Sequence, residues 1–150
     1  RDGFHAAMEG SGHTIVKGPY AEYIRSNAVV AMQDLLQAHP DVKVVYAHND
    51  DMALGAMQVL EENDRGDVLV SGVDGLSEAL GVMASGGNYV ASALNDPQYL
   101  GDVTIQVARE LAAGRAVPKF VDAGSKAVTP ENVGDFPRGG LFAEYRPNIF

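Results

Sequence analysis

Short apolar runs of strand length alternate along this 150-residue chain with longer segments whose apolar residues recur every three or four positions. Runs typical of β-strands cover residues 42–47, 68–73 and 89–94, and we also expect a short strand over 13–17. Helices are expected over residues 3–9, 21–38, 51–62, 77–85 and 99–113. Alternation of this kind is typical of β-α-β units. The sequence therefore predicts an α/β fold, with a doubly wound, mostly parallel sheet flanked by helices.

Capping and breaking residues support these boundaries. Pro40 follows the second helical segment and cannot continue it, and Gly114 is placed to end the last helix. Pro97 suits the first turn of that last helix, because the missing N–H would have no partner there. Asn49 or Asp50 can cap the helix that follows residues 42–47.

The amino-acid composition excludes several classes of function. The chain has no cysteine, which excludes a disulfide scaffold, a thiolate zinc site, an iron–sulfur cluster and a cysteine nucleophile. Its formal net charge of −9 argues against nucleic acid as a partner, since phosphate binding needs a basic face. No run of about 18 apolar residues is present, so we expect no membrane insertion.

Three short polar side chains follow consecutive predicted strands. Asp74 and Asn95 each come directly after an apolar run, and Asn49 follows its run after His48. The carboxyl ends of parallel strands meet at one sheet edge, where open α/β sheets bind their ligands. Carboxylates and carboxamides at such an edge can hold adjacent hydroxyls, which suits a polyhydroxylated ligand better than an anion. Such residues are also common caps and turn formers, so a purely structural role stays open for each.

Other constellations are incomplete. His48 and Asp50 could ligate a metal, but two residues do not make a site. Asp50 and Asp51 could imitate the acidic pocket of a phospho-receiver, yet the remaining parts have no matching spacing. No nucleotide fingerprint, nucleophile elbow or nucleophile–base pair is present. We therefore expect no enzyme, no cofactor and no metal site.

Several motifs together resemble a known family. Residues 44–57 read Val-Val-Tyr-Ala-His-Asn-Asp-Asp-Met-Ala-Leu-Gly-Ala-Met. Further matching segments are Ala-His-Pro-Asp-Val at 38–42, Val-Ser-Gly-Val-Asp-Gly at 70–75, Ala-Ser-Ala-Leu-Asn-Asp-Pro at 91–97 and Val-Thr-Pro-Glu-Asn-Val at 128–133. In order and spacing the chain resembles the type I periplasmic sugar-binding proteins of ABC importers, with ribose- and galactofuranose-binding relatives. The likeness runs from about residue 3 to 133.

The resemblance implies a set of ligand-binding residues. The family residues that match Asn49 and Asp74 hydrogen-bond sugar hydroxyls, and Asn95 falls where relatives carry a Gln, Asn or Glu that does the same. Tyr23 falls where relatives place an aromatic or another ligand-contacting side chain; an ordinary aromatic at a helix start is the alternative. Arg1 lies three residues before Phe4, whereas the family arginine lies four before it, so Arg1 departs from the pattern by one position.

The resemblance also implies a division of the chain. Residues 1–95 would form the C-terminal sugar-binding lobe, residues 96–118 a helix that packs on a missing N-terminal lobe, and residues 119–150 a returning hinge strand and tail. We then expect a helix over 99–113 to expose an apolar stripe of Val103, Val107 and Leu111.

The implied function is that of a periplasmic solute-binding component of an ABC sugar importer. It would hold a monosaccharide or polyol between two lobes without catalysis and would deliver it to the importer permease. Asp74, and with it Asp50, would face the polyol. The alternative is the effector-binding core of a LacI-type transcription regulator, which shares the fold and an Asn-Asp motif like that at residues 49–50.

Overall fold

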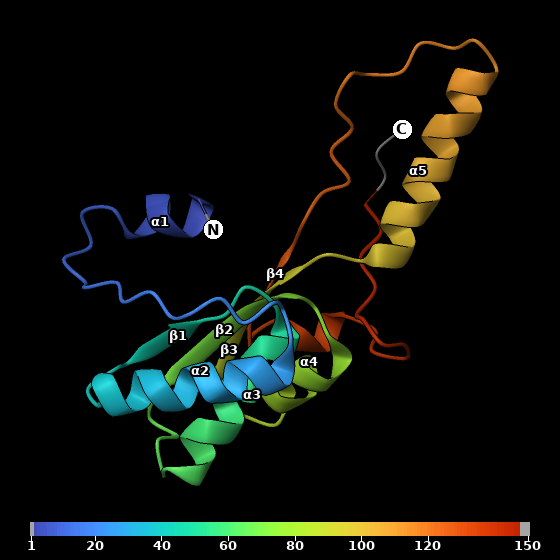
Figure 1. Ribbon diagram of the computed structural model, residues 1–150. Helices are drawn as coiled ribbons and strands as arrows, with labels where there is room; N and C mark the ends of the chain where they lie inside the picture. The colour runs from blue at the N-terminus through green and yellow to red at the C-terminus, as the bar shows by residue number, and fades with distance from the viewer. Residues whose placement is uncertain (1, 148–150) are drawn as a thin grey trace.

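One four-stranded sheet organises the chain, and the strands lie in the order β1–β2–β3–β4 (Figure 1). The computed structural model describes residues 2–147. Its strands are β1 (Val44–Tyr46), β2 (Leu69–Asp74), β3 (Tyr89–Leu94) and β4 (Ala127–Val128). Its helices are α1 (Asp2–Met8), α2 (Arg25–Ala38), α3 (Asp50–Glu62), α4 (Ser77–Ala84), α5 (Pro97–Ala112) and the 3₁₀ turn η1 (Val133–Asp135).

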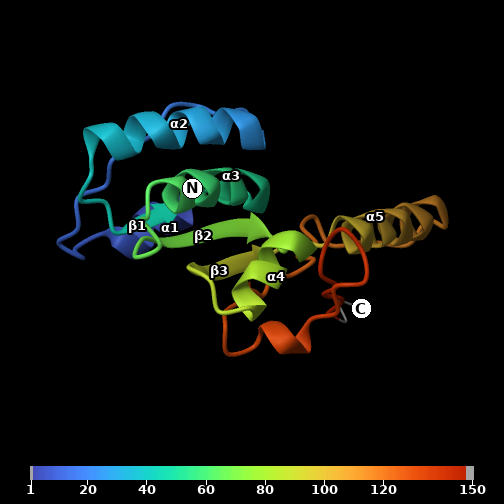
Figure 2. The same cartoon turned by 90° about the horizontal axis from the view of Figure 1, so that it is seen from below.

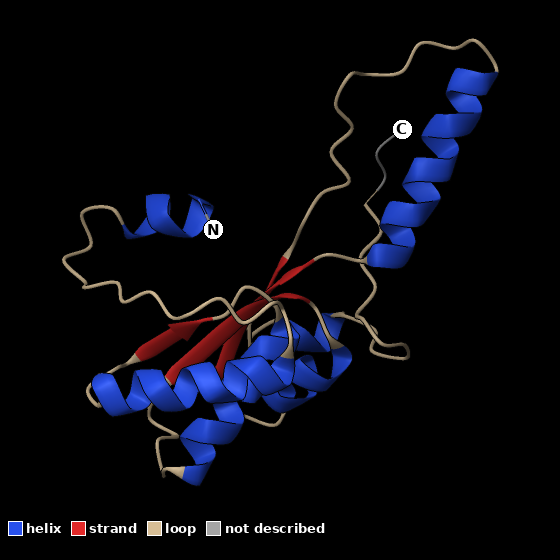
Figure 3. Cartoon of the chain, in the orientation of Figure 1, coloured by secondary structure: helices blue, strands red, loops and turns tan. Residues whose placement is uncertain are grey.

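The sheet is mostly parallel, as predicted. β1 pairs with β2 and β2 with β3 in parallel, and the short β4 adds an antiparallel edge through Ser92 and Val128 (Figure 3). Helices α3 and α4 connect successive parallel strands. This confirms an α/β fold with a parallel-dominated sheet flanked by helices.

The helices lie in layers beside the sheet. α3 packs on β1 and β2, α4 packs on β3, and α2 lies over α3 on the side away from the strands (Figure 2). Gly55 permits the close approach of α2 and α3, because a Cβ there would lie 2.5 Å from the carbonyl oxygen of Arg25. The largest buried apolar side chains are those of Leu60, Leu80, Met83, Tyr89 and Leu94, together with Val59, Val68, Val70 and Val128.

Two predictions for the first part of the chain were wrong, namely a strand at residues 13–17 and the start of the second helix. Residues 13–17 form no strand, because they pair with no other strand, and every residue from 11 to 20 is exposed. α2 begins at Arg25 rather than near residue 21. Glu22 and Tyr23 have φ values of 55° and 61°, and Ile24 is extended, so the backbone cannot enter the helix earlier.

α5 projects away from the layered body (Figure 1). Asp96 caps its first turn by accepting the N–H groups of Gln98 and Tyr99, and Pro97 occupies the first turn as predicted. The predicted exposed stripe is only partly present: Val103 is buried at 7% exposure and Val107 is half-buried, whereas Leu111 is 57% exposed. Among the described residues, no helix has both the length and the apolar character needed to cross a bilayer.

Candidate ligand-binding site

The polar edge of the sheet is built by the strand ends that the sequence indicated. Asp74 ends β2, and Asn95 follows β3 directly beside it. The Asn95 side-chain amide lies 3.4 Å from Asp74 Oδ1, and the Asn95 backbone N–H donates to the Asp74 carbonyl at 3.1 Å. Burial raises the pKa of the half-buried Asp74, and the hydrogen bond from Asn95 opposes that rise. Asp74 and Asn95 therefore form one polar pair at this edge.

Asn49 caps α3, as one of the two predicted cap residues. Its Oδ1 accepts the N–H of Met52 at 2.9 Å, and its Nδ2 donates to the carbonyl of Tyr23 at 3.2 Å. The amide retains a second N–H and a second lone pair for a ligand, because an asparagine side chain has two of each. Asn49 therefore has a clear structural role and spare hydrogen-bonding capacity.

Tyr23 stands close to Asn49 through that contact. Its side chain is 53% exposed, and the ring of Tyr20 lies edge-on to it at a centroid distance of 6.1 Å. A free aromatic face of this kind can pack on the C–H side of a sugar ring. The structure thus brings Tyr23 to Asn49 and Asn95 to Asp74, whereas Arg1 lies outside the described residues.

The helix that follows Arg1 is anchored beside β1. Phe4 of α1 stacks on Tyr46 at the end of β1, with ring centroids 4.4 Å apart and planes 3° from parallel. Phe4, from which the position of Arg1 was compared, therefore lies next to the strand that leads to Asn49.

Asp50 does not face a ligand, which corrects the expectation that it lines the polyol site. Its side chain is fully buried. Its Oδ2 accepts the N–H groups of Gly75 at 2.8 Å and Leu76 at 2.7 Å, while the hydroxyls of Tyr89 and Ser92 donate to Oδ1. Burial raises the pKa of Asp50, and these hydrogen bonds counter that rise.

The metal and phospho-receiver alternatives gain no support from this geometry. Asp50 is enclosed, whereas His48 is exposed and Asp51 is bound to Arg25. No group of three potential metal-ligating side chains occurs in the part of the chain that the structure describes.

Arg25 forms an ion network that the sequence did not reveal. Its Nε lies 2.9 Å from Asp51, and its two terminal nitrogens lie 2.9 and 2.7 Å from the carboxylate oxygens of Glu78. These hydrogen bonds lower the pKa of Glu78. The partners are 26 and 53 residues away along the chain, so no local pattern indicates them. Arg25 thus joins the starts of α2, α3 and α4 beside the polar edge.

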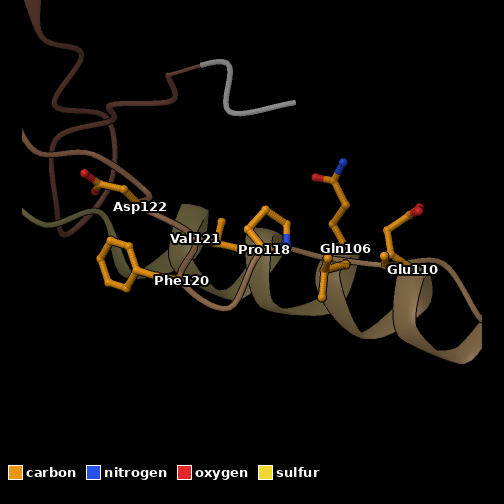
Figure 4. A pocket seen from close by; sticks show the side chains of 8 residues that line it. Gln106, Glu110, Pro118, Phe120, Val121 and Asp122 are labelled. Atoms are coloured by element: carbon orange, nitrogen blue, oxygen red, sulfur yellow. The ribbon is translucent and has the colours of Figure 1, made fainter.

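A surface hollow lies elsewhere in the molecule. It is formed by α5 and the segment that returns from it, and its lining includes Gln106, Glu110, Pro118 and Phe120 (Figure 4). It shares no residue with the polar edge.

Residues 1–116, which are most of the chain, match the family model of the periplasmic binding protein domain. The chain belongs to the periplasmic binding protein family. It is 32% identical over 127 residues to a ribose import binding protein of Bacillus subtilis, covering 85% of this chain and 41% of that protein.

Solved structures of periplasmic binding proteins share the fold. An ABC transporter solute-binding protein of Mycobacterium smegmatis with bound glycerol superposes with a TM-score of 0.90 and 59% identity, covering 96% of this chain and 50% of that one. The arabinose-transporter binding protein of Shewanella sp. ANA-3 gives a TM-score of 0.80 and 26% identity, covering 89% of this chain and 46% of that one. The chain therefore spans about half the length of these relatives.

The periplasmic binding protein family consists of binding proteins rather than enzymes. The Bacillus subtilis relative is a ribose import binding protein and the Shewanella protein is a component of an arabinose ABC transporter, and they do not favour the alternative of a transcription-regulator core.

Proposed function

We propose that this chain is the C-terminal lobe of a periplasmic solute-binding protein of an ABC importer, and that the whole protein binds a monosaccharide or polyol without chemical turnover. The observation that carries the proposal is the polar edge itself. Asn49, Asp74 and Asn95 follow three adjacent parallel strands, and two of them lie within 3.4 Å of each other.

The chemistry of this edge favours a neutral ligand with several hydroxyls. A carboxylate and two carboxamides offer acceptors and donors in short, planar groups, which match neighbouring hydroxyls of a sugar rim. Tyr23, whose backbone carbonyl accepts from Asn49, adds an exposed aromatic ring for the C–H side of the sugar. The carboxylate of Asp74 makes this edge acidic, which disfavours an anionic ligand. Arg1 completes the proposed set from outside the described region.

The ligand needs a second wall. The polar edge is open to solvent, whereas small-molecule sites bury most of their ligand. The relatives are about twice as long as this chain, so a second lobe would supply that wall. In this arrangement residues 1–95 form the ligand-binding lobe, residues 96–118 pack on the other lobe, and residues 119–150 return through the hinge. The liganded protein would dock on an importer permease in the periplasm.

Calorimetry on the full-length protein tests the proposal. The protein is titrated with a panel of pentoses, hexoses, furanose sugars and polyols. We expect saturable binding of at least one neutral member, and chromatography of the mixture should return the ligand unchanged. Heat from none of them, or formation of a product, would contradict the proposal.

A further inference from the structure

The turn that carries Asp74 has an unusual backbone. Asp74 has a φ of 115° and the following Gly75 a φ of 78°. Residues other than glycine rarely adopt a φ in this range, and such backbone conformations persist only where the surrounding structure holds them. The turn therefore needs an anchor, and the side chain that it orients is the carboxylate of the proposed ligand site.

Asp50 supplies that anchor from another element. Its carboxylate accepts the N–H groups of the two residues directly after Asp74, at 2.8 Å from Gly75 and 2.7 Å from Leu76. Leu76 is the N-cap of α4 and makes no side-chain capping bond, so Asp50 places its acceptor at the start of that helix. A negative charge is favoured at this end of a helix dipole.

The position of the carboxylate is itself fixed. Ser92 Oγ lies 2.9 and 3.0 Å from the two oxygens of Asp50, and the hydroxyl of Tyr89 donates to Oδ1. Gly72 leaves the space for this group, because a Cβ there would lie 2.5 Å from Asp50 Oδ1. Asp50 is fully buried, so it has no freedom to turn towards solvent.

We infer that Asp50 is a positioning residue for the ligand site, and that its buried carboxylate holds the turn at residues 74–76 in the conformation that aims Asp74 at the ligand. The inference rests on the proposed function of Asp74. Asp50 touches no ligand and acts through the backbone of Gly75 and Leu76.

The experiment compares two changes at one position in the full-length protein. Asp50→Ala removes the carboxylate that accepts both backbone N–H groups, and it leaves the Gly75 N–H with the longer bond to Ser92 Oγ, at 3.2 Å. Asp50→Asn keeps one oxygen for them, and its amide can donate to the hydroxyls of Tyr89 and Ser92, which also accept. Calorimetry with the sugar that the wild-type protein binds should show affinity at least about tenfold weaker for Asp50→Ala, and within about threefold of wild type for Asp50→Asn.

Val59→Ala is the matched control for a general loss of stability. Val59 is fully buried in α3 and contacts no member of this network by hydrogen bond. We expect Val59→Ala to lower the free energy of unfolding but to keep the wild-type affinity. Amide hydrogen exchange without ligand gives a second measurement. Gly75 and Leu76 should exchange faster in Asp50→Ala than in Val59→Ala.

Each outcome bears on the inference. Wild-type affinity in folded Asp50→Ala, or a loss in Asp50→Asn as large as in Asp50→Ala, would overturn it. Where Asp50→Ala does not fold, Ser92→Ala replaces it, because it removes the hydroxyl that touches both carboxylate oxygens. That hydroxyl also accepts the Gly75 N–H at 3.2 Å, so exchange is read at Leu76, whose N–H donates to Asp50. Unchanged affinity and unchanged exchange at Leu76 in that variant would also overturn the inference. If the wild-type protein binds no sugar, the proposed function fails, and the exchange measurement alone decides whether Asp50 holds the turn.

Discussion

At the scale of the residue, Asp74 combines a proposed ligand-binding carboxylate with an unfavourable backbone conformation. Its carboxylate lies at the polar edge, and its φ of 115° lies in a region that favours glycine. We expect Asp74→Ala and Asp74→Gly to weaken sugar binding equally, by about 100-fold or more, because both leave donors of the ligand unpaired in an enclosed site. Isothermal titration of the full-length protein measures the affinities.

The same pair of variants should separate in stability. Glycine adopts the backbone conformation of Asp74 without strain, whereas alanine does not. The free energy of unfolding of Asp74→Gly should therefore be about 1 kcal/mol higher than that of Asp74→Ala. Chemical denaturation provides the comparison. Equal stability of the two variants would show that the turn is not strained, and unchanged affinity in either would remove Asp74 from the site.

The sequence can indicate residues whose place at the sheet edge follows from their position after a strand. Asn49, Asp74 and Asn95 could be selected in this way, and the cap formed by Asn49 could be predicted from its position before α3. The sequence does not indicate the roles of Asp50 and Arg25 because their partners lie 25 to 53 residues away. Only the folded sheet and the packed helix starts bring those groups together.

At the scale of the element, Arg25 is the link between three helix starts. Its contacts with Glu78 lower the pKa of that carboxyl, so the folded state favours the ionised form. The stabilisation is therefore present above the unfolded pKa of about 4.3 and is lost as the pH falls through the lowered folded value. Glu78→Gln should lower the free energy of unfolding by about 0.5 kcal/mol at pH 7, a small effect because the pair is largely exposed to solvent.

Urea denaturation at pH 7 and at pH 2.5 tests this link. The difference between Glu78→Gln and wild type should disappear at the lower pH. Glu61→Gln is a suitable control, because Glu61 is an exposed acid of α3 without an ion-pair partner among the described residues. A difference that persists at pH 2.5, or an equal effect of Glu61→Gln at pH 7, would contradict the assignment.

The helices and buried strands could be predicted because each carries its own signal. Apolar spacing, Pro97 and Gly114 are local features, and α3, α4, α5, β2 and β3 match the expected ranges closely. Residues 13–17 look like a strand locally, but a strand exists only with a hydrogen-bonded neighbour. The early start expected for α2 failed for a related reason: the left-handed turn at Glu22 and Tyr23 has no strong glycine or proline signal.

At the scale of the whole molecule, the polar edge and helix α5 both have surfaces that are open to solvent. The polar edge faces solvent with only one wall, and α5 stands away from the layered body with Ile105 and Leu111 more than half exposed (Figure 1). Under the proposed function, the second lobe covers both the exposed apolar surface of α5 and the open site.

The isolated chain of 150 residues should therefore bind sugar far more weakly than the full-length protein. We expect at least about a 100-fold loss of affinity, because a ligand on one wall keeps much of its surface in water and loses half of its hydrogen-bonding partners. Calorimetry on both proteins measures the difference, and circular dichroism with a cooperative thermal transition must first show that the isolated chain is folded. Equal affinity in a folded isolated chain would mean that this lobe forms a complete site alone, and it would remove the need for a second wall.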